Sequence, residues 1–565
     1  MLARRLADVG PALERMEAAV ADGLHAAGFV NYEAAPAFDS ALTVKSSTDS
    51  PIPLLWFGLY RTPPSTPDLE TALDALEIPS CTAPDAPEAA APAWTPSLDR
   101  ERYDRAVERV HDYIYRGDTY QINFTFRLRA PFVGGGTEFF RSLVRAQGPH
   151  YAAYLEAEDF AVFSASPELF FRLDGNRVES RPMKGTIARG RTLAEDRERA
   201  ATLRDSPKNR AENVMIVDMI RNDLGRVAVP GSVRVENLFE IRRYPTVWQM
   251  TSTVAATTQA PVRDLMAALF PCASITGAPK PRSMTIIAEL ETTPRGLYCG
   301  TLGYVAPGRR AQFNVAIRTV VADKRRGTAE YGVGGGIVWD SVSGDEYEEC
   351  RTKALVLTRE QLPFRLLETL LWTPEEKFFL LDRHLSRLAE SAEYFGFTAD
   401  IAAIRVQLEE WERAAGPIPC RLRLFVAAGG GVQIEHEPLT ALPDPARLKL
   451  APCPVDPADA FLYHKTTHRR IYEQAKAACP DCDDVLLWNA AGEVTESTVA
   501  NVVADRDGQW VTPPVSCGLL PGTFRAELLA QGKIREAVLR VQDLPRCRGL
   551  FLINSVRRWR KAERV

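Results

Sequence analysis

The spacing of hydrophobic residues along the chain predicts helices in several places. In the stretch 100–117, RERYDRAVERVHDYIYRG, apolar residues recur at helical spacing and the pattern ends at a glycine. The residues on this single helical face are Tyr103, Val107, Val110 and Ile114. The stretch 207–225, PKNRAENVMIVDMIRNDLG, predicts a second helix that opens at Ser206-Pro207 and closes at Gly225. Residues 1–24 have an amphipathic helical pattern, with no apolar core segment or cleavage site of a secretory signal.

Runs rich in β-branched and aromatic residues predict strands between the helices. In the first part of the chain these runs are FAVFSAS (160–166), AQFNVAIRTVVAD (311–323) and AEYGVGGGIVWD (329–340). In the last part they are CRLRLFVAA (420–428), DDVLLWN (483–489) and VANVVAD (499–505). No internal repeat relates the two parts, so the pattern indicates two unlike α+β units.

Two interruptions of the regular hydrophobic pattern divide the chain. Residues 79–97 are rich in proline and alanine without a hydrophobic period, which predicts a surface linker. The sequence TREQLP near residues 358–363 separates a helical run from a new strand-like run. A length of 565 residues exceeds what one core usually serves. We therefore predict domains at 1–360, with the linker inside it, and at 361–565.

Composition narrows the class of protein. Hydrophobic residues make up 45% and charged residues 25%, as in ordinary globular proteins. The net charge of −4 comes without basic and aromatic interleaving, which argues against a nucleic-acid partner. No apolar run reaches the length that spans a membrane, and the ten cysteines have no framework spacing. The pair Cys479 and Cys482 lacks companions for a zinc site. We expect a cytoplasmic protein with reduced thiols.

Candidate chemistry in the first part centres on a lysine and a glutamate. Lys184 lies in the turn SRPMKGTIARG, where it is either an ordinary solvated cation or an amine held as a nucleophile. Glu168 lies beside apolar residues in SPELFF, where burial would raise the pKa of its carboxyl and suit it to donate a proton. The alternative for Glu168 is a glutamate at an exposed strand edge.

Further carboxylates lie on predicted helices. Glu212 is near the start of the helix 207–225, where an exposed glutamate also suits the helix dipole. In DEYEECRTKALVL, helical spacing places Glu346, Glu349 and Lys353 on one face, which alone is compatible with a solvated ion pair. Upstream, Gly334–Gly336 offer backbone N–H groups to an anion, although they match neither the dinucleotide nor the P-loop fingerprint.

Taken in order, these segments resemble the chorismate-utilising enzymes, which include anthranilate, isochorismate and aminodeoxychorismate synthases. The resemblance covers roughly residues 28–358 and rests on GFVNYEAA, DTYQINFT, SPELFF, RPMKGT, RAENVMIVDMIRNDLG, PCASITGAPKPRSM, GTLGY, NVAIRT and GGGIVWDS followed by DEYEE. It implies an anthranilate synthase component I-like domain, a β-sandwich with helices. Relatives that make anthranilate or isochorismate have alanine where this chain has Lys184, whereas aminodeoxychorismate synthases have lysine. The resemblance therefore implies amination of chorismate at C4.

The resemblance also implies roles for individual residues. Lys184 would add at C2 of chorismate while Glu168 protonates the departing C4 oxygen, after which ammonia would attack C4 and expel the lysine. Glu212 and Glu349, with Glu346 nearby, would hold Mg²⁺. The groups that would orient the carboxylates and ring of the substrate are Thr276, Tyr304, Arg318, Gly334, Gly335, Gly336 and Lys353. One departure is Gln249, where many relatives have histidine.

The sequence around the cysteines bears on the source of ammonia. Glutamine hydrolysis of the relevant class uses a cysteine in a G-x-C-x-G turn, and none of the ten cysteines has that context. We expect either a separate glutamine amidotransferase subunit or free ammonia.

The second part of the chain resembles the fold-type IV pyridoxal-phosphate (PLP) enzymes, which include aminodeoxychorismate lyase and branched-chain and D-amino acid aminotransferases. The resemblance rests on DRHLSRLAESAEYFGF, FLYHKTTHRRIYEQA, GEVTESTVANVV and TPPVSCGLLPGTFRAELL, over roughly residues 364–558. By resemblance Lys465 links covalently to PLP and Glu496 pairs with the pyridinium nitrogen. The phosphate would be bound by Arg387, Thr498, Gly522 and Thr523. Oligomerisation through this part is left open.

Fusion of the two parts favours a chain that makes 4-aminobenzoate from chorismate and ammonia, with a lyase consuming the aminodeoxychorismate made upstream. Three alternatives stay open: a second part that is a transaminase, a second part with a structural role, or a regulatory protein that only binds chorismate or tryptophan. One feature bears on the lyase: Ala428 stands where some lyases have an arginine, and strand alternation puts Arg421 and Arg423 on the opposite face.

Overall fold

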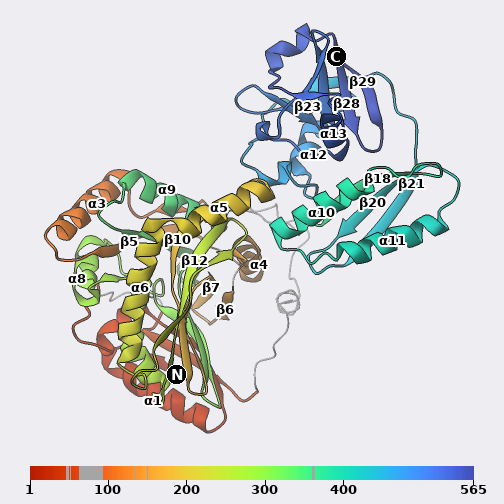
Figure 1. The fold of residues 1–565 in the computed structure, drawn as a ribbon. Helices are drawn as coiled ribbons and strands as arrows, with labels where there is room; N and C mark the ends of the chain where they lie inside the picture. Colours follow the sequence, from red (N-terminus) through yellow and green to blue (C-terminus); the bar gives the residue numbers. More distant parts are fainter. Residues whose placement is uncertain (46–49, 51, 63–92, 133, 149, 359–362) are drawn as a thin grey trace. The chain divides into compact units, whose positions relative to one another are not determined.

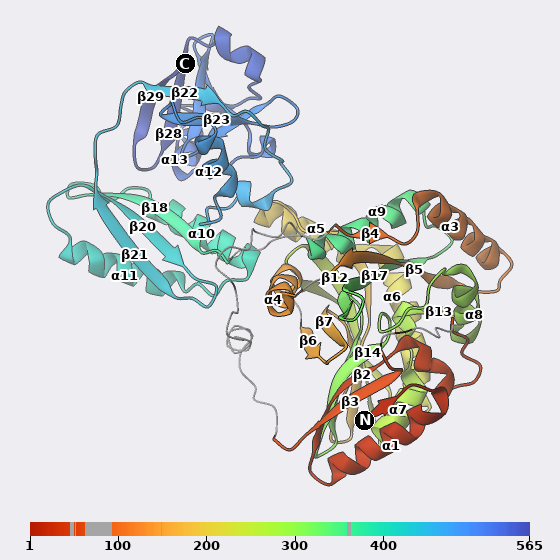
Figure 2. The ribbon, with the colours of Figure 1, turned by 180° about the vertical axis from the view of Figure 1, so that it is seen from behind.

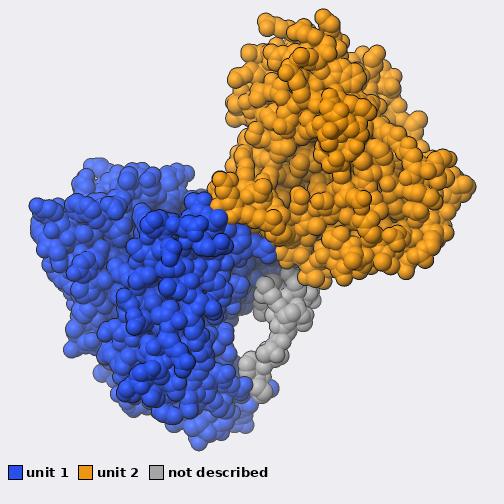
Figure 3. Space-filling model, viewed as in Figure 1, with its two compact units in different colours: residues 1–188, 200–361 blue, residues 189–199, 362–565 orange. Residues whose placement is uncertain are grey.

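A computed structural model describes the chain except residues 46–49, 51, 63–92, 133, 149 and 359–362. The described residues form two compact units (Figure 3). Unit 1 comprises Met1–Ala188 and Ala200–Gln361, and unit 2 comprises Arg189–Arg199 and Leu362–Val565. Most of the predicted linker at 79–97 lies outside the described residues.

Unit 1 contains a ten-stranded antiparallel sheet in its described part. In spatial order its strands are β1 (Leu2–Ala3), β3 (Leu55–Tyr60), β2 (His25–Val30), β14 (Thr301–Ala306), β15 (Arg310–Val315), β8 (Leu169–Asp174), β9 (Arg177–Arg181), β12 (Val247–Thr257) and β10 (Met183–Ala188), and β11 (Arg234–Arg243) also pairs with β12. Figure 2 shows β2, β3 and β14 side by side.

A second, seven-stranded sheet completes the β-structure of unit 1 in its described part. Its order is β13 (Gly277–Ala278), β5 (Gln121–Pro131), β17 (Thr328–Ile337), β16 (Thr319–Asp323), β7 (Phe160–Ser166) and β6 (Tyr151–Glu156), with β4 (Thr95–Pro96) on β5. The prediction of one strand over 311–323 was wrong, because the chain leaves β15 in the first sheet and enters β16 in the second. Arg318 makes that crossing with a positive φ of 52°, a backbone region that non-glycine residues seldom adopt.

The helices of unit 1 lie on these sheets. They are α1 (Leu6–Ala21), α3 (Arg100–Tyr115), α4 (Gly136–Gln147), α6 (Pro207–Gly225), α7 (Val262–Leu269), α8 (Lys280–Leu290) and α9 (Ser343–Ala354), with 3₁₀ turns at η1 (Tyr32–Ala37), η2 (Ala273–Ile275) and η3 (Leu355–Leu357). The predicted helices at 100–117 and 207–225 are confirmed as α3 and α6. The Ser206 hydroxyl caps α6 by accepting from the Asn209 N–H, and Pro207 occupies the first turn.

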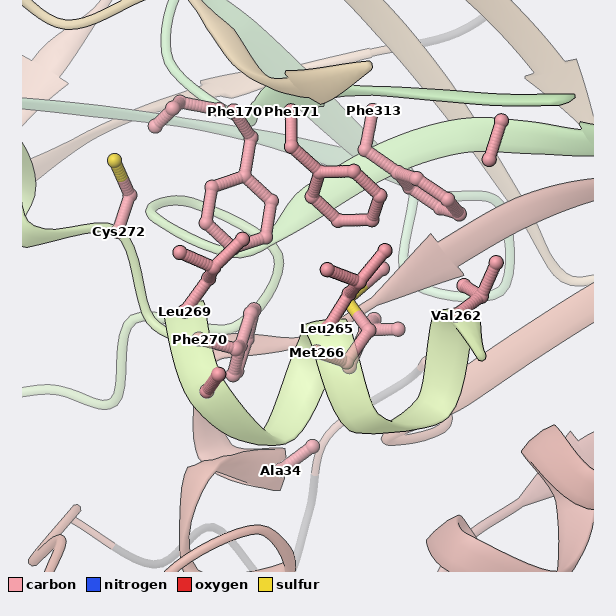
Figure 4. Close-up of a cluster of buried hydrophobic side chains, with 14 of the residues drawn as sticks. Ala34, Phe170, Phe171, Val262, Leu265, Met266, Leu269, Phe270, Cys272 and Phe313 are labelled. Carbon is pink, nitrogen blue, oxygen red and sulfur yellow. The ribbon is translucent and has the colours of Figure 1, made fainter. Parts of the chain in front are cut away.

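Packing in unit 1 fixes where the helices sit. α6 lies along β10 and β12, and α9 packs on β17 (Figure 1). In one core, α7 presents Leu265, Met266 and Leu269 to Phe170, Phe171 and Phe313 of β8 and β15 (Figure 4). A smaller cluster joins Phe29 of the first sheet to Phe160 and Val162 of the second, as in a sandwich.

Unit 2 contains two sheets in its described part. The first has the order β19 (Lys377–Phe378), β18 (Leu366–Thr373), β20 (Cys420–Val426) and β21 (Val432–Pro438). It packs against α10 (Leu381–Phe395) and α11 (Ile401–Ala414) around a core that includes Leu370, Leu388 and Leu408. This is the usual arrangement of helices on one face of an antiparallel sheet.

The second sheet of unit 2 closes into a small barrel. Its strands run β24 (Val494–Ser497), β23 (Asp484–Trp488), β22 (Ala446–Leu450), β29 (Arg558–Arg564), β28 (Gly549–Asn554), β25 (Asn501–Arg506), β26 (Gln509–Thr512) and β27 (Arg535–Glu536), and the pairing of β24 with β25 closes the ring. Around it lie η4 (Ala460–Leu462), α12 (Arg470–Ala477), η5 (Val515–Cys517), α13 (Thr523–Ala530) and η6 (Val541–Arg546). The remaining helix, α5 (Leu193–Asp205), begins in unit 2 and ends in unit 1.

These elements confirm the α+β class that the sequence predicts. Among the residues that the structure describes, no helix has the length and apolar character needed to cross a bilayer.

Candidate active sites

A bulge in β10 sets the direction of Lys184. Met183 pairs with Thr251 and Thr186 with Gln249, so two residues, Lys184 and Gly185, lie opposite one residue of β12. Such a bulge turns a side chain away from the regular alternation of the strand. Gly185 has φ of 96°, and a Cβ there would lie 3.0 Å from the Asn209 side chain, so the turn requires glycine.

Lys184 and most of the predicted residues of unit 1 line one cavity of about 340 Å³. The predicted residues in its wall are Glu168, Lys184, Glu212, Arg318, Gly334, Gly335, Gly336, Glu346, Glu349 and Lys353. They come from β10, the approach to β8, α6, the β15–β16 crossing, β17 and α9. The fold thus brings together groups that are up to 185 residues apart, from Glu168 to Lys353 (353 − 168).

The amine of Lys184 lies close to the glycine-rich strand β17. A Cβ built on Gly336 would lie 3.0 Å from Lys184 Nζ, and one on Gly335 would lie 2.9 Å from Glu346 Oε2. The three glycines pair residue by residue with β5, from Gly334 opposite Thr125 to Gly336 opposite Asn123. Gly335 and Gly336 therefore leave room for the Glu346 carboxylate and the Lys184 amine beside the strand.

Burial sets the protonation of Lys184 and Glu168. Burial lowers the pKa of Lys184, and Glu212 and Glu168 oppose that shift. Burial raises the pKa of Glu168 to about 7, opposed by a hydrogen bond from Ser274. The Ser274 hydroxyl donates to Glu168 Oε1 at 2.6 Å. The site therefore holds an amine that loses its proton more easily than usual and a carboxyl that keeps its proton near neutral pH.

The carboxylates of α6 and α9 differ in their partners. Burial raises the pKa of Glu212 and of Glu346, and Ser341 donates to Glu346 Oε1 at 2.7 Å. Lys353 lies 2.6 Å from Glu349 and lowers the pKa of that carboxyl. Lys353 Nζ also donates to the Gly334 carbonyl at 2.9 Å. The predicted ion pair on α9 is present, and it lies in the wall of the cavity.

The oxygen donors in this wall suit Mg²⁺, which prefers carboxylates and water. Like-charge repulsion from Glu349 adds to the raised pKa of Glu212, and a bound cation would relieve it. Among the described residues, no three histidine, cysteine, aspartate or glutamate side chains are gathered into a ready metal site.

Two predicted residues lie elsewhere. Tyr304, in β14, is 41% exposed and is not among the residues that line the cavity; the aromatic residues in the wall are Tyr298 and Tyr331. Thr276 is fully buried behind the wall, and its hydroxyl donates to the carbonyls of Cys272 and Ala273. In place of the assignment to Tyr304, the structure puts Tyr298 beside the substrate space.

The sequence interpretation also missed Ser274, Lys208 and Asn209, which line the same wall. Serine and asparagine are common in turns and at helix starts, so nothing in their local pattern singles them out. Gln249, which replaces the histidine of many relatives, also lines the cavity and accepts from the Thr186 hydroxyl at 3.0 Å. A larger cavity of about 610 Å³ shares Tyr298 and Gly332 with the first but contains neither Lys184 nor Glu168.

In unit 2, Lys465 is partly buried where the first sheet approaches the barrel. Its carbonyl accepts from the Leu367 N–H at 3.0 Å, and Thr466 bridges Leu366 of β18. Burial lowers the pKa of Lys465 to about 8, with further lowering by Arg387 and Arg469. The lowered pKa gives this amine a larger neutral fraction near physiological pH than an ordinary lysine has, and the neutral form is the one that attacks an aldehyde.

Glu496 lies in β24 with three hydrogen-bond donors around it. The Tyr472 hydroxyl donates to Oε1 at 2.8 Å, the Leu520 N–H donates to Oε1 at 3.2 Å and the Asn501 amide donates to Oε2 at 3.2 Å. Burial nevertheless raises the pKa of Glu496 to about 7. A buried carboxyl with this pKa suits a partner that carries a shared proton, such as a pyridinium nitrogen.

Arg387, predicted to bind phosphate, is part of a buried charged network. Its Nε and Nη2 donate to the two oxygens of Glu368 at 2.9 and 2.7 Å, and Nη1 donates to the Pro521 carbonyl at 3.2 Å. His384 Nδ1 lies 2.6 Å from Glu368 Oε2, and its Nε2 lies 3.2 Å from the hydroxyl of Thr523. Although burial opposes it, Arg387 and His384 lower the pKa of Glu368 to about 2.

The remaining predicted phosphate groups surround the start of α13. Gly522 is its N-cap, and a Cβ there would lie 2.0 Å from Asn501 Oδ1, so glycine allows the close approach. The Thr498 hydroxyl donates to Asp484 Oδ1 at 2.5 Å and retains its capacity to accept. The donor set of Lys465, Arg387 and the α13 N-terminus therefore fits an aldehyde that carries a phosphate.

Comparisons with known proteins match two different families to two parts of the chain. Residues 5–359 match the family model of the chorismate binding enzymes, and residues 365–565 match that of the class IV amino-transferases. Aminodeoxychorismate synthase component 1 of Salmonella typhimurium is 41% identical over 259 residues, which is 46% of this chain and 57% of that protein. Anthranilate synthase component 1 of Aquifex aeolicus is 38% identical over 268 residues, 47% of this chain and 54% of that protein. The matched stretches thus span little more than half of these relatives.

A solved structure extends the likeness to the fold. Anthranilate synthase component I from Streptococcus pneumoniae superposes with a TM-score of 0.53 at 26% identity, over 61% of this chain and 85% of that one.

Proposed function

The chain belongs to the family of chorismate binding enzymes, and we propose that unit 1 is an aminodeoxychorismate synthase, which replaces the C4 hydroxyl of chorismate with an amino group. The observation that carries this proposal is the buried amine of Lys184, aimed by a β-bulge into the same cavity as Glu168. An enzyme that adds water or ammonia directly at C2 has no need for a second nucleophile there.

The proposed reaction has two displacements. Lys184 Nζ adds to C2 of chorismate, the two conjugated ring double bonds shift toward C4, and the C4–O bond breaks while Glu168 donates a proton to the departing oxygen, which leaves as water. Ammonia then adds at C4, both double bonds shift back, and the C2–N bond to Lys184 breaks. A proton from the incoming nitrogen returns to Glu168, so the sum is chorismate and ammonia to 4-amino-4-deoxychorismate and water. The pKa of Glu168, raised to about 7, suits both halves of this exchange.

Orientation would come from the cationic groups of the wall. Lys353, held by Glu349 and the Gly334 carbonyl, and Arg318, which donates to the Lys353 carbonyl, place positive charge beside the glycine strand. These groups suit the two carboxylates of chorismate. Glu212 and Glu349 would hold Mg²⁺, which when bound supplies positive charge to a substrate carboxylate.

We propose that a separate glutamine amidotransferase subunit supplies the ammonia. The printed sequence has no cysteine in the G-x-C-x-G context that this hydrolysis uses. Free ammonium at sufficient concentration would bypass the subunit.

For unit 2 we propose a PLP-dependent lyase that converts 4-amino-4-deoxychorismate to 4-aminobenzoate and pyruvate. PLP, when bound through Lys465, supplies an electron sink for the charge left at C4. Lys465 removes the C4 proton and later protonates the departing pyruvate. Glu496, Arg387, Thr498 and the start of α13 hold the cofactor in place.

A second candidate for unit 2 is a transaminase or a structural partner. The observation that favours it lies on β20, where Arg421 and Arg423 pair with Glu437 and Glu435 of β21. Both guanidinium groups are thus engaged across the strands, while Ala428 offers no charge to a substrate carboxylate.

Product analysis separates these functions. The purified chain is incubated with chorismate, Mg²⁺ and ammonium, with and without PLP. Formation of 4-aminobenzoate and pyruvate in equal amounts only with PLP supports both units as successive enzymes. Accumulation of 4-amino-4-deoxychorismate in both conditions supports the synthase and rejects the lyase. No consumption of chorismate rejects the proposal for unit 1.

A further inference from the structure

Unit 2 is assembled from two stretches that lie far apart in the sequence. Residues Arg189–Arg199 belong to it together with Leu362–Val565, although they fall within the stretch 5–359 that matches the chorismate binding enzymes (Figure 3). This short segment begins directly after β10, the strand that carries Lys184. The chemistry proposed for Lys184 and Lys465 gives it no role.

The segment contains a buried ion pair of its own, and reciprocal hydrogen bonds join it to Tyr394 of α10. Arg189 and Asp196 lie 2.6 Å apart, and their side chains are 6% and 2% exposed. Arg189 Nη2 donates to the Tyr394 carbonyl at 2.7 Å, and the Tyr394 hydroxyl donates back to the Gly190 carbonyl at 2.7 Å. The Arg189 guanidinium also lies over the Tyr394 ring, 4.4 Å from its centroid. Because a buried charge needs partners, the Arg189 guanidinium is held in one place, between Asp196 and Tyr394.

The contact continues to the residue before Lys465. The Tyr394 ring stacks on the His464 imidazole with centroids 4.2 Å apart and planes at 28°. Ser391 Oγ lies 3.0 Å from His464 Nδ1, and the ring of Phe395 meets the imidazole edge-on at 5.0 Å. The His464 ring is therefore enclosed on several sides by α10.

Arg191 of the same segment contacts Tyr463, the residue before His464. Arg191 Nη1 donates to the Tyr463 hydroxyl at 3.3 Å, and its guanidinium lies 5.4 Å from the centroid of that ring. On the other side of the chain, the Lys465 carbonyl accepts from Leu367. The backbone that carries the lysine is thus held by the segment and α10 on one side and by β18 on the other.

We propose that Arg189–Arg199 is a positioning element of the lysine site, which fixes Lys465 through Tyr394 and His464. The inference rests on the proposed cofactor role of Lys465. The amine must meet one atom of a cofactor that other groups hold independently, so a small displacement of its backbone weakens the covalent link. Displacement would also admit water to an amine surrounded by Arg387, Arg469, Glu368 and Glu496.

The experiment uses the full chain loaded with PLP. Equilibrium dialysis gives the Kd for PLP, and the visible absorbance of the bound cofactor, followed against pH, gives the midpoint of covalent attachment. Tyr394→Leu, which removes the ring but keeps an apolar side chain, is expected to raise the Kd by roughly tenfold. It is also expected to move the midpoint to higher pH, because the lysine regains water and holds its proton longer.

Two further variants grade the effect. Tyr394→Phe keeps the stacking on His464 and loses the hydrogen bond from the hydroxyl to the Gly190 carbonyl, so its Kd should lie between the parent and Tyr394→Leu. Arg197→Ala is the matched control within the same segment, because Arg197 pairs with Glu393 at the surface, with side chains 64% and 52% exposed. It should bind PLP as the parent does. Thermal unfolding of all variants shows that they remain folded under the conditions used.

The outcomes separate the two proposals. A parent chain that forms the cofactor band, with Kd and midpoint unchanged in a folded Tyr394→Leu, overturns the positioning role and leaves the lyase proposal standing. A parent chain that forms no such band overturns the cofactor proposal and the positioning role with it. If Tyr394→Leu does not fold, Arg191→Ala carries the same test through Tyr463, and an unchanged midpoint there overturns the inference.

Discussion

The two candidate lysines are buried alike but lie in opposite electrostatic surroundings. Burial is the largest cause of the lowered pKa of both Lys184 and Lys465. Around Lys184 the next largest effects come from Glu212 and Glu168, which favour the charged amine. Around Lys465 they come from Arg387 and Arg469, which disfavour it. A buried lysine is therefore not one kind of group, because its neighbours decide how far the shift goes.

The difference in charged neighbours matches the chemistry proposed for each lysine. In unit 1 the carboxylates that oppose the shift are also the groups proposed to hold Mg²⁺ and to donate a proton, so the proposal gives them a role in the reaction as well as beside the lysine. In unit 2 the arginines add to burial in lowering the pKa of Lys465 to about 8, and they also suit a phosphate. Both sites thus use charged neighbours for two purposes at once.

The largest expected effects on product formation come from removing each of the two amines. Lys184→Ala is expected to lower aminodeoxychorismate formation by roughly three orders of magnitude or more, because the covalent step is lost. It should leave unit 2 able to process added aminodeoxychorismate. Lys465→Ala should do the reverse, so that 4-amino-4-deoxychorismate accumulates. Product analysis with each variant makes the measurement.

The matched control for both is Lys324→Ala, since Lys324 is a surface lysine that pairs with Glu156. It should behave as the parent does. Full aminodeoxychorismate formation by Lys184→Ala would remove the covalent role assigned to that lysine.

Replacing the proton donor should have the next largest effect. Glu168→Gln keeps the shape of the side chain but cannot donate a proton, and the rate of amination should fall by about 10²- to 10⁴-fold. Glu156→Gln, a change of the same kind at the surface, is the control. A loss of less than about threefold in kcat for Glu168→Gln would contradict its role as general acid.

The sequence predicts much of this arrangement, and its failures have physical causes. Periodicity locates α3, α6 and the helical face of Glu346, Glu349 and Lys353, because those patterns are local. It cannot show that AQFNVAIRTVVAD spans two sheets, since the break depends on one backbone angle at Arg318. It also cannot choose between Tyr304 and Tyr298, because the facing of each side chain depends on long-range pairing.

The charged network of unit 2 shows the same limit. Arg387 is visible in the sequence as a candidate, but its partners Glu368 and His384 become visible only when β18 and α10 pack together. Likewise, no local pattern indicates that residues 189–199 belong to unit 2. Contacts between distant segments carry this information, and a single sequence does not record them.

Removing the charge of one arginine near Lys465 tests how far the neighbours of that lysine set its pKa, without removing a reacting group. Arg469→Met keeps a long side chain over the Tyr472 ring, where the guanidinium lies 4.5 Å from the centroid, but removes its charge. Because Arg469 lowers the pKa of Lys465, its loss should raise that pKa by about one unit. The pH midpoint of covalent PLP attachment should rise accordingly, and Arg470→Met serves as a control on the same helix. A midpoint that falls would contradict the electrostatic account.

The smallest expected effect concerns the serine beside Glu168. Ser274 donates to the carboxylate and so favours its charged form, which partly offsets the raising of the Glu168 pKa by burial. Ser274→Ala removes that donor, so the pKa should rise further, by about half a unit to one unit. Since Glu168 acts as an acid, the alkaline limb of the kcat profile for amination should move to higher pH by the same amount. Ser274→Thr, which keeps a hydroxyl, should restore the original limb; a profile unmoved by Ser274→Ala would mean that burial alone sets the protonation of Glu168.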